Sequence, residues 1–136
     1  MIPARELRPA LHAATGLVAL LLGVLPRPLE LAGAAVGVLA GWVVIPRSPL
    51  EARLRRPGEP FLGGLRTYPL AVAGLIVALP DTLAAVGWAV FAWGDAAASV
   101  VGRHVPAPAV FGHRKATWSG SLAFLVVGTA VGWAIG

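Results

Sequence analysis

The stretch that decides the fold covers residues 82–115 and reads "TLAAVGWAVFAWGDAAASVVGRHVPAPAVFGHRK". Its first part, residues 82–101, is apolar and long enough to cross a bilayer, which takes about 20 helical residues. One carboxylate, Asp95, interrupts this span about 9 Å from its end, at a rise of about 1.5 Å per residue. An ionisable side chain at such depth is costly in lipid and usually faces a cavity or a partner. The span therefore predicts both a membrane helix and a candidate site.

The composition of the whole chain agrees with a membrane protein. Of 136 residues, 57% are hydrophobic and only 12% are charged, whereas soluble domains carry about 25% charged residues. The mean hydropathy is +0.79. The 17 glycines fit close helix packing in lipid, and the absence of cysteine excludes disulfides and thiol catalysis. We predict an all-α, polytopic transmembrane helical bundle.

The apolar runs define a single transmembrane domain, residues 1–136, with about five spans. We place them at residues 10–25, 29–45, 69–79, 82–101 and 117–135, with prolines marking their boundaries. The third span is short, so we expect it to begin earlier, near Leu62, or to be sheltered by its neighbours. Asp81 follows a proline and is expected to cap the next helix.

The basic residues orient this topology. With the N-terminus in the cytoplasm and the C-terminus outside, only Arg27 of the 11 lysines and arginines lies outside, as the positive-inside rule expects. We therefore assign the net charge of +5 to membrane orientation and expect no nucleic-acid partner.

The chemistry-bearing residues gather around Asp95. Ser99 lies one helical turn later on the same face, and Arg103, Arg114 and Lys115 follow at the cytoplasmic end. One carboxylate among bases favours a site where Asp95 holds Mg²⁺ and the basic residues neutralise phosphate groups. The alternative is structural: Asp95 pairs with an arginine, and the basic loop only orients the chain.

Two further features have both a structural and a functional interpretation. His12, near the start of the first span, is either a helix-end histidine at the interface or a phosphate contact or proton shuttle. The glycines at positions 33, 37 and 41 form two overlapping G-x-x-x-G steps. These steps are typical of helix packing, within the chain or across a dimer.

Four segments together resemble a known family. They are "ELRPALHAATGL" (residues 6–17), "FLGGLRTYPLAV" (61–72), "GDAAASVVGR" (94–103) and "RKATWSGSLA" (114–123). This pattern resembles the membrane family of dolichol kinase, phytol kinase and CTP-dependent diacylglycerol kinase, which is distantly similar to phosphatidate cytidylyltransferases. The resemblance implies an enzyme that transfers a phosphoryl group from CTP to a lipid alcohol, such as phytol or a polyprenol, with Mg²⁺. We expect the protein to be integral to the bacterial inner membrane.

The resemblance also implies roles for individual residues. Asp95, which would bind the metal, and Lys115 would be catalytic, and His12 would lie at the cytoplasmic edge of the pocket. The residues implied to bind the nucleotide are Gly94, Ser99, Gly102, Arg103, Arg114, Thr117, Gly120 and Ser121.

The sequence departs from the family pattern at a few positions. Ser119 stands where an acidic residue is common, and Ala116 where a second basic residue is common. The family tends to have more than five helices, so we expect a short or truncated member, or one completed by a partner. Glu51 or Glu59 could replace the acidic residue. Cytidylyl transfer to phosphatidate and an inactive structural or lipid-binding subunit remain alternatives, and a homo-oligomer remains open.

Overall fold

The computed structural model describes residues 4–54, 63–112 and 116–136. Within these ranges the chain is helical, and its only extended pairing is an isolated bridge between Ala109 and Thr117. The elements in order are α1 (Ala4–Ala19), α2 (Arg27–Leu39), the π-helical turn η1 (Ala40–Val44), the 3₁₀ turn η2 (Ile45–Arg47), α3 (Leu50–Leu54), α4 (Gly64–Ala78), α5 (Asp81–His104), the 3₁₀ turn η3 (Val110–Gly112) and α6 (Trp118–Ile135).

The predicted all-α fold is confirmed for the described residues. Among them, three helical segments are long and apolar enough to cross a membrane: Arg27–Arg47, which joins α2, η1 and η2, then Asp81–His104 and Trp118–Ile135. Helix α4 is apolar but has only 15 residues, and α1 has 16 residues. These two helices overlap the remaining predicted spans, and the count of five spans remains a prediction.

The connection between α1 and α2 begins earlier than the hydropathy predicted. Helix α1 ends at Ala19 instead of near residue 25, because the following leucines form tight turns closed by bonds such as Leu22 N–H to the carbonyl of Ala19. Gly23 then takes a positive φ of 80°, a conformation that glycine adopts without steric cost. An apolar run is therefore not the same as a helix here.

Two predictions at proline positions need correction. Pro69 is not a boundary but lies inside α4, which begins at Gly64, so the expectation of an earlier start is confirmed. Asp81 is not an N-cap: Pro80 occupies that position and no side-chain cap bond forms. The carboxylate of Asp81 instead pairs with Arg27 at 2.6 Å.

Gly41 of η1 lets the chain pack closely against the internal proline of α4. A Cβ at Gly41 would lie 2.8 Å from Cγ of Pro69 and 2.9 Å from the carbonyl oxygen of Leu65. Only glycine lets the two backbones approach this closely, so the predicted packing role of the glycine stripe holds at this position.

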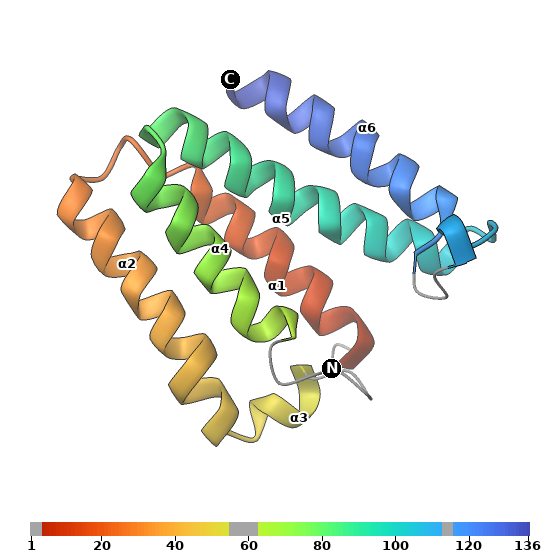
Figure 1. Ribbon diagram of the computed structural model, residues 1–136, viewed down its shortest axis with the longest axis horizontal. Coiled ribbons are helices and arrows are strands. Elements are labelled where there is room, and N and C mark those ends of the chain that lie inside the picture. The colour runs from red at the N-terminus through yellow and green to blue at the C-terminus, as the bar shows by residue number, and fades with distance from the viewer. Residues whose placement is uncertain (1–3, 55–62, 113–115) are drawn as a thin grey trace.

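The helices form two groups. Helix α6 packs along α5, and α5 packs along α1, while α2 packs along α4 (Figure 1). Trp93 of α5 donates its indole N–H to the carbonyl of Ala13 at 2.8 Å, and it lies against Gly16, where a Cβ would come within 2.6 Å of that nitrogen. Glycine on α1 thus sets the close approach of α1 and α5.

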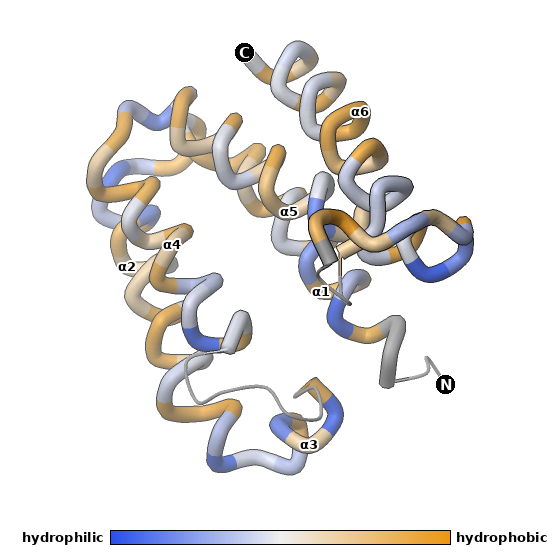
Figure 2. Tube along the Cα trace, turned by 45° about the vertical axis from the view of Figure 1, so that its right-hand side comes forward, coloured by the Kyte–Doolittle hydropathy of each residue, from blue (hydrophilic) through white to orange (hydrophobic). Residues whose placement is uncertain are grey.

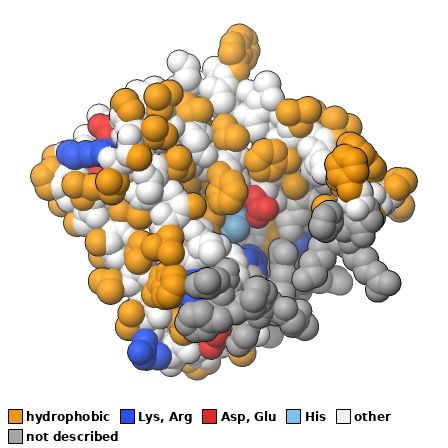
Figure 3. Space-filling model, in the orientation of Figure 1, with side chains coloured by type: hydrophobic (Ala, Val, Ile, Leu, Met, Phe, Trp, Pro, Cys, Tyr) orange, Lys and Arg blue, Asp and Glu red, His pale blue; other side chains and the backbone are white. Residues whose placement is uncertain are grey.

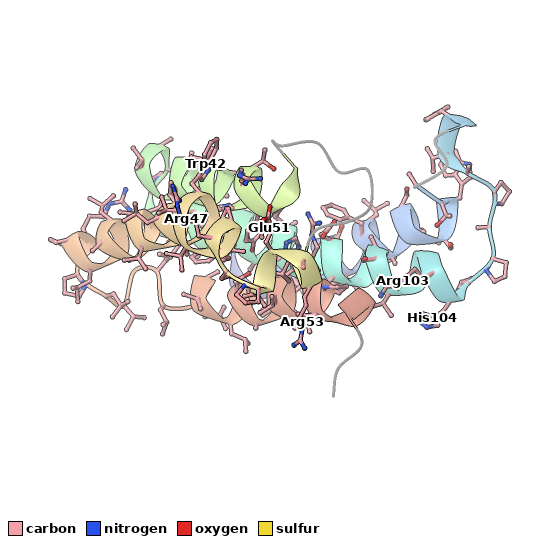
Figure 4. The ribbon with its side chains drawn as sticks, turned by 90° about the horizontal axis from the view of Figure 1, so that it is seen from below. Trp42, Arg47, Glu51, Arg53, Arg103 and His104 are labelled. Atoms are coloured by element: carbon pink, nitrogen blue, oxygen red, sulfur yellow. The ribbon has the colours of Figure 1, made fainter. Side chains whose placement is uncertain are left out.

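Charged residues concentrate at one end of the bundle. The start of α1, the short helix α3, the start of α4 and the end of α5 lie toward the lower right in Figure 1. Seen from below, this end displays Arg47, Arg53 and Arg103 (Figure 4), and hydrophilic stretches cluster at α3 and at helix ends (Figure 2). Arg27 begins α2 at the opposite end.

The outer surface differs from that of a soluble protein, whereas the interior is apolar in the usual way. The buried residues are rich in alanine, with Leu54, Val72, Ile76 and Trp88 as the larger ones. Many large apolar side chains are instead exposed, among them Val36, Leu125 and Trp133. Exposure in water would cost about 25 cal/mol for each Å² of apolar surface, so this distribution favours a lipid surrounding.

Candidate functional site

The carboxylate of Asp95 is paired with His12. Nδ1 of His12 on α1 lies 2.9 Å from Oδ2 of Asp95 on α5. An ionised carboxylate only accepts hydrogen bonds, so Nδ1 carries the proton and the other ring nitrogen, Nε2, is an acceptor in the neutral imidazole. The side chain of His12 is 15% exposed and that of Asp95 is 47% exposed. The pair is therefore a His–Asp dyad with a defined tautomer, open to its surroundings on the Asp95 side.

An aromatic stack holds the imidazole from its face. The ring of His12 stacks on Tyr68 of α4 at a centroid distance of 4.4 Å and an angle of 15°. Tyr68 in turn stacks on Phe91 of α5 at 5.5 Å. Three helices thus contribute one ring each to the stack, and the orientation of His12 depends on α4 as well as on α5.

Hydrogen bonds fix the tyrosine that supports the stack. Thr15 donates its hydroxyl proton to the carbonyl of His12 at 2.8 Å, so its oxygen accepts from the Tyr68 hydroxyl at 2.6 Å. The Tyr68 oxygen accepts from the indole N–H of Trp88 at 2.9 Å. Each of these three hydrogen-bond donors has an acceptor, so the hydrogen bonds hold Tyr68 rigidly in place.

The dyad opens into a polar hollow. This hollow of about 220 Å³ is lined by Arg8, His12, Gly64, Thr67, Tyr68, Ala71, Phe91 and Asp95. Figure 3 shows a histidine beside an acidic side chain on this face, next to a basic side chain. A larger cavity of about 360 Å³ adjoins it, since Arg8, His12, Gly64 and Tyr68 line both spaces. His12 and Tyr68 therefore stand between a polar and an apolar compartment.

The motif glycines bring α5 and α6 together. A Cβ at Gly94 would lie 2.8 Å from the ring of Phe124, one at Gly102 would lie 2.9 Å from Oγ1 of Thr117, and one at Gly120 would lie 2.9 Å from the carbonyl of Ala98. The structure gives these three glycines a packing function, and their contact with a nucleotide stays a prediction.

The remaining predicted residues lie toward the end of α5 and the start of α6. Arg103 donates to the hydroxyl of Ser99 at 3.1 Å, one turn away along α5. Thr117 caps α6 by accepting from the N–H of Gly120 at 3.2 Å, and Ser121 is exposed one turn later. Ser99 is one turn from Asp95, so α5 connects this polar group with the dyad.

Several predicted residues lie away from the dyad or outside the described residues. Arg114, Lys115 and Glu59 fall outside them. Glu51, a proposed substitute for the missing acidic residue, lies 3.9 Å from Arg66 in an ion pair between α3 and α4. It does not line the hollow, so its described position gives it a structural contact instead.

The residues around Asp95 fit one mode of Mg²⁺ binding. In the described part of the chain no group of three or more His, Cys, Asp or Glu side chains could hold a metal by itself. Mg²⁺ commonly binds through one or two carboxylates together with substrate phosphates and waters. A single half-exposed carboxylate facing a hollow suits that mode and does not suit an all-protein cage.

Sequence reasoning missed the support around His12. Tyr68, the only tyrosine in the chain, bonds to Thr15 and Trp88 and stacks on His12. A lone tyrosine in an apolar helix was the available signal, because a buried tyrosine hydroxyl usually has a hydrogen-bond partner.

A second charged cluster, also missed, lies at the opposite end. Glu30 of α2 is buried, and it accepts from the N–H of Gly23 at 2.7 Å and from Arg27 at 3.3 Å. Arg27 also pairs with Asp81 and donates to the carbonyl of Ile76. This cluster ties the α1–α2 connection to the α4–α5 turn.

Comparison of the chain with protein-family models, with curated proteins and with solved structures found no match.

Proposed function

We propose that this chain is a CTP-dependent lipid-alcohol kinase of the bacterial inner membrane, with its basic end and N-terminus in the cytoplasm. The observation that carries the proposal is the His12–Asp95 dyad at the boundary between a polar hollow and an apolar cavity. A lipid alcohol and a charged nucleotide must meet at such a boundary. The resemblance to dolichol and phytol kinases in the segments around both residues supports the same reaction.

The dyad supplies the base that the reaction needs. Nε2 of His12 would take the proton of the acceptor hydroxyl while Asp95 stabilises the imidazolium that forms. The hydroxyl oxygen then bonds to the γ-phosphorus of CTP, the bond from that phosphorus to the bridging oxygen breaks, and CDP leaves. Phosphoryl transfer needs little more from the protein than positioning and charge neutralisation.

Positive groups and a cation would balance the phosphates. Arg8 lines the hollow, and Arg103, Arg114 and Lys115 follow Asp95 in the sequence. A carboxylate has about four lone-pair sites, so Asp95 can both accept from His12 and hold Mg²⁺. When bound, the cation would neutralise charge on the phosphate oxygens.

The dyad favours a kinase over cytidylyl transfer to phosphatidate. A phosphate monoester is already ionised and needs no base to attack, whereas an alcohol does. The test is an assay of the protein in nanodiscs with α- or γ-labelled CTP and a panel of prenyl alcohols, diacylglycerol and phosphatidate. We expect γ-label on a prenyl alcohol. An α-label on phosphatidate would replace the proposal with cytidylyl transfer, and no label together with no CTP-dependent stabilisation would favour a non-enzymatic subunit.

The first prediction concerns Asp95. We expect D95N to reduce transfer by about 10²-fold or more, since it removes both the partner of the base and the cation ligand. D81N is the matched control: it removes a carboxylate from the same helix with a similar exposure, 38% against 47%, at the opposite end of the bundle. Equal rates for D95N and wild type would refute the site.

A further inference from the structure

The turn between α5 and α6 presents an aromatic side chain at its tip. Phe111 of η3 is 87% exposed, and η3 lies at the end of the hairpin that α5 and α6 form (Figure 1). Trp118, the first residue of α6, is 52% exposed. The two rings pack edge to face with their centroids 5.9 Å apart. Together they form one exposed unit, the Phe111–Trp118 pair.

Phe111 holds this position in an unfavourable backbone conformation. Its φ is 46° and its ψ is 36°, in the left-handed region that a bulky side chain rarely adopts. Among the residues that the structure describes, no other residue except glycine has a positive φ. Glycine at the tip would make the turn without steric cost. Such outliers persist where the surrounding structure fixes them, and they cluster at functional positions.

Hydrogen bonds on both sides of the tip hold the pair in place. The N–H of Val110 donates to the carbonyl of Ala116 at 2.8 Å, and the N–H of Trp118 donates to the carbonyl of Pro108 at 3.1 Å. These bonds close the turn on either side of Phe111. The exposure of its ring is therefore a fixed feature of the turn.

Two tryptophans mark the ends of α6. This helix is long and apolar enough to cross a membrane, and Leu122 and Leu125 are exposed between Trp118 and Trp133. The tryptophans lie 15 positions apart, about 22 Å at a rise of about 1.5 Å per residue, compared with a hydrocarbon core of about 30 Å. Tryptophan is enriched at both membrane–water interfaces. A spanning α6 therefore places Trp118, and with it Phe111, near one border of the bilayer.

The end of α5 that precedes the turn is polar. Arg103 and His104, in its last turn, are exposed, and Figure 4 shows both at this end. Long basic side chains near helix ends reach the headgroup layer, so Arg103 agrees with an interface at this depth. In bulk water the two aromatic rings would instead leave a large apolar surface hydrated, which is unfavourable.

We propose that the Phe111–Trp118 pair anchors the α5–α6 turn in the headgroup layer of the bilayer, with the ring of Phe111 among the upper acyl chains. Lipid covers this surface because it continues into the exposed apolar side of α6. The anchor sets the depth of this end of the molecule. The proposal requires that α6 spans a membrane, and it does not depend on the proposed kinase reaction.

Labels at single cysteines test the depth, since the chain has no cysteine of its own. Phe111→Cys and, as the matched control, Leu125→Cys are labelled with the fluorophore NBD and placed in nanodiscs. Leu125 is exposed on the same helix, seven positions after Trp118 and thus about 10 Å deeper. Lipid nitroxides near the headgroup or near the bilayer centre then quench the label. We expect the shallow nitroxide to quench more strongly at position 111 and the deep one at position 125.

Three outcomes would overturn the proposal. Quenching at position 111 mainly by iodide in the water would place the tip outside the bilayer. The same quenching order at positions 111 and 125 would place the turn at the depth of the middle of α6. Aromatic side chains also stack on nucleotide bases, so emission at position 111 that changes with CTP and ignores lipid nitroxides would assign the pair to a nucleotide.

A second measurement asks whether the ring of Phe111 holds the turn. The label is placed at the exposed Ala116 through Ala116→Cys and combined with Phe111→Gly or Phe111→Trp. Phe111→Gly relieves the positive φ, so a loss of anchoring cannot be ascribed to a strained or unfolded turn. We expect iodide quenching of the label to increase in Phe111→Gly and to stay at the wild-type level in Phe111→Trp. Unchanged quenching in Phe111→Gly, or an equal increase in both, would contradict the anchor.

Discussion

Two acidic side chains, Glu30 and Asp95, lie within apolar helices but differ in their exposure and in their partners. The Glu30 side chain is 0% exposed and is enclosed by Arg27 and the N–H of Gly23. The Asp95 side chain is 47% exposed and pairs with a histidine at the edge of a hollow. Both satisfy the rule that a charge in lipid needs a partner. The difference teaches that depth alone does not identify a functional carboxylate: its partner's chemistry and the space beside it do.

The largest expected effect is on kcat and comes from replacing His12, the partner of Asp95. We expect H12Q to lower kcat by about 10²–10⁴-fold, the usual contribution of a general base. Stopped assays of the wild-type protein and H12Q measure this loss.

His104 supplies the control for that measurement. It lies at the exposed end of α5 and its Nδ1 is 2.8 Å from the carbonyl of Val100. H104Q should keep the wild-type rate. A wild-type rate for H12Q would show that His12 is not the base and that its pairing with Asp95 is only structural.

The next effect is on stability and concerns Glu30. E30A leaves Arg27 and the N–H of Gly23 without their buried acceptor, and breaking a buried ion pair typically costs about 3–5 kcal/mol. We expect the free energy of unfolding in detergent to fall by about that amount. D81A, at the exposed side of the same cluster, should cost less, and D95N should leave stability nearly unchanged. Equal losses for E30A and D95N would remove the distinction between the two carboxylates.

The smallest effect is expected from the tyrosine hydroxyl. Y68F keeps the ring stack but leaves the indole N–H of Trp88 without an acceptor, which costs about 1–3 kcal/mol for a buried group. Combining Y68F with W88F removes both partners, so the double variant should lose less than the sum of the two single losses. Additive losses would show that this hydrogen bond does not couple the two side chains.

The sequence predicted the positions of the long helices because hydropathy and prolines report local structure. It failed where local signals conflict: the leucines after Ala19 read as helix but turn at Gly23, and Pro69 reads as a boundary but lies inside α4. In the second case Gly41, on a different helix, packs closely against the proline. A signal on another helix cannot be read from the local pattern.

The candidate site was predictable only in part. A carboxylate in an apolar run identifies Asp95 without a structure. Its partner lies 83 positions earlier, and the pairing depends on the close approach of α1 and α5 at Gly16 and Trp93. The motif glycines show the same limit, since a glycine needed for a ligand and one needed for a neighbouring helix look identical in sequence.

One consequence follows from the double-sided position of His12 and Tyr68. With Arg8 and Gly64, these two residues line both the polar hollow and the apolar cavity. Under the proposed reaction, the nucleotide arrives from the aqueous phase and the alcohol enters sideways from the bilayer, and they meet across a single imidazole. Under this reaction the apolar alcohol would not have to leave the bilayer. The phosphorylated product would form with its new headgroup on the aqueous side.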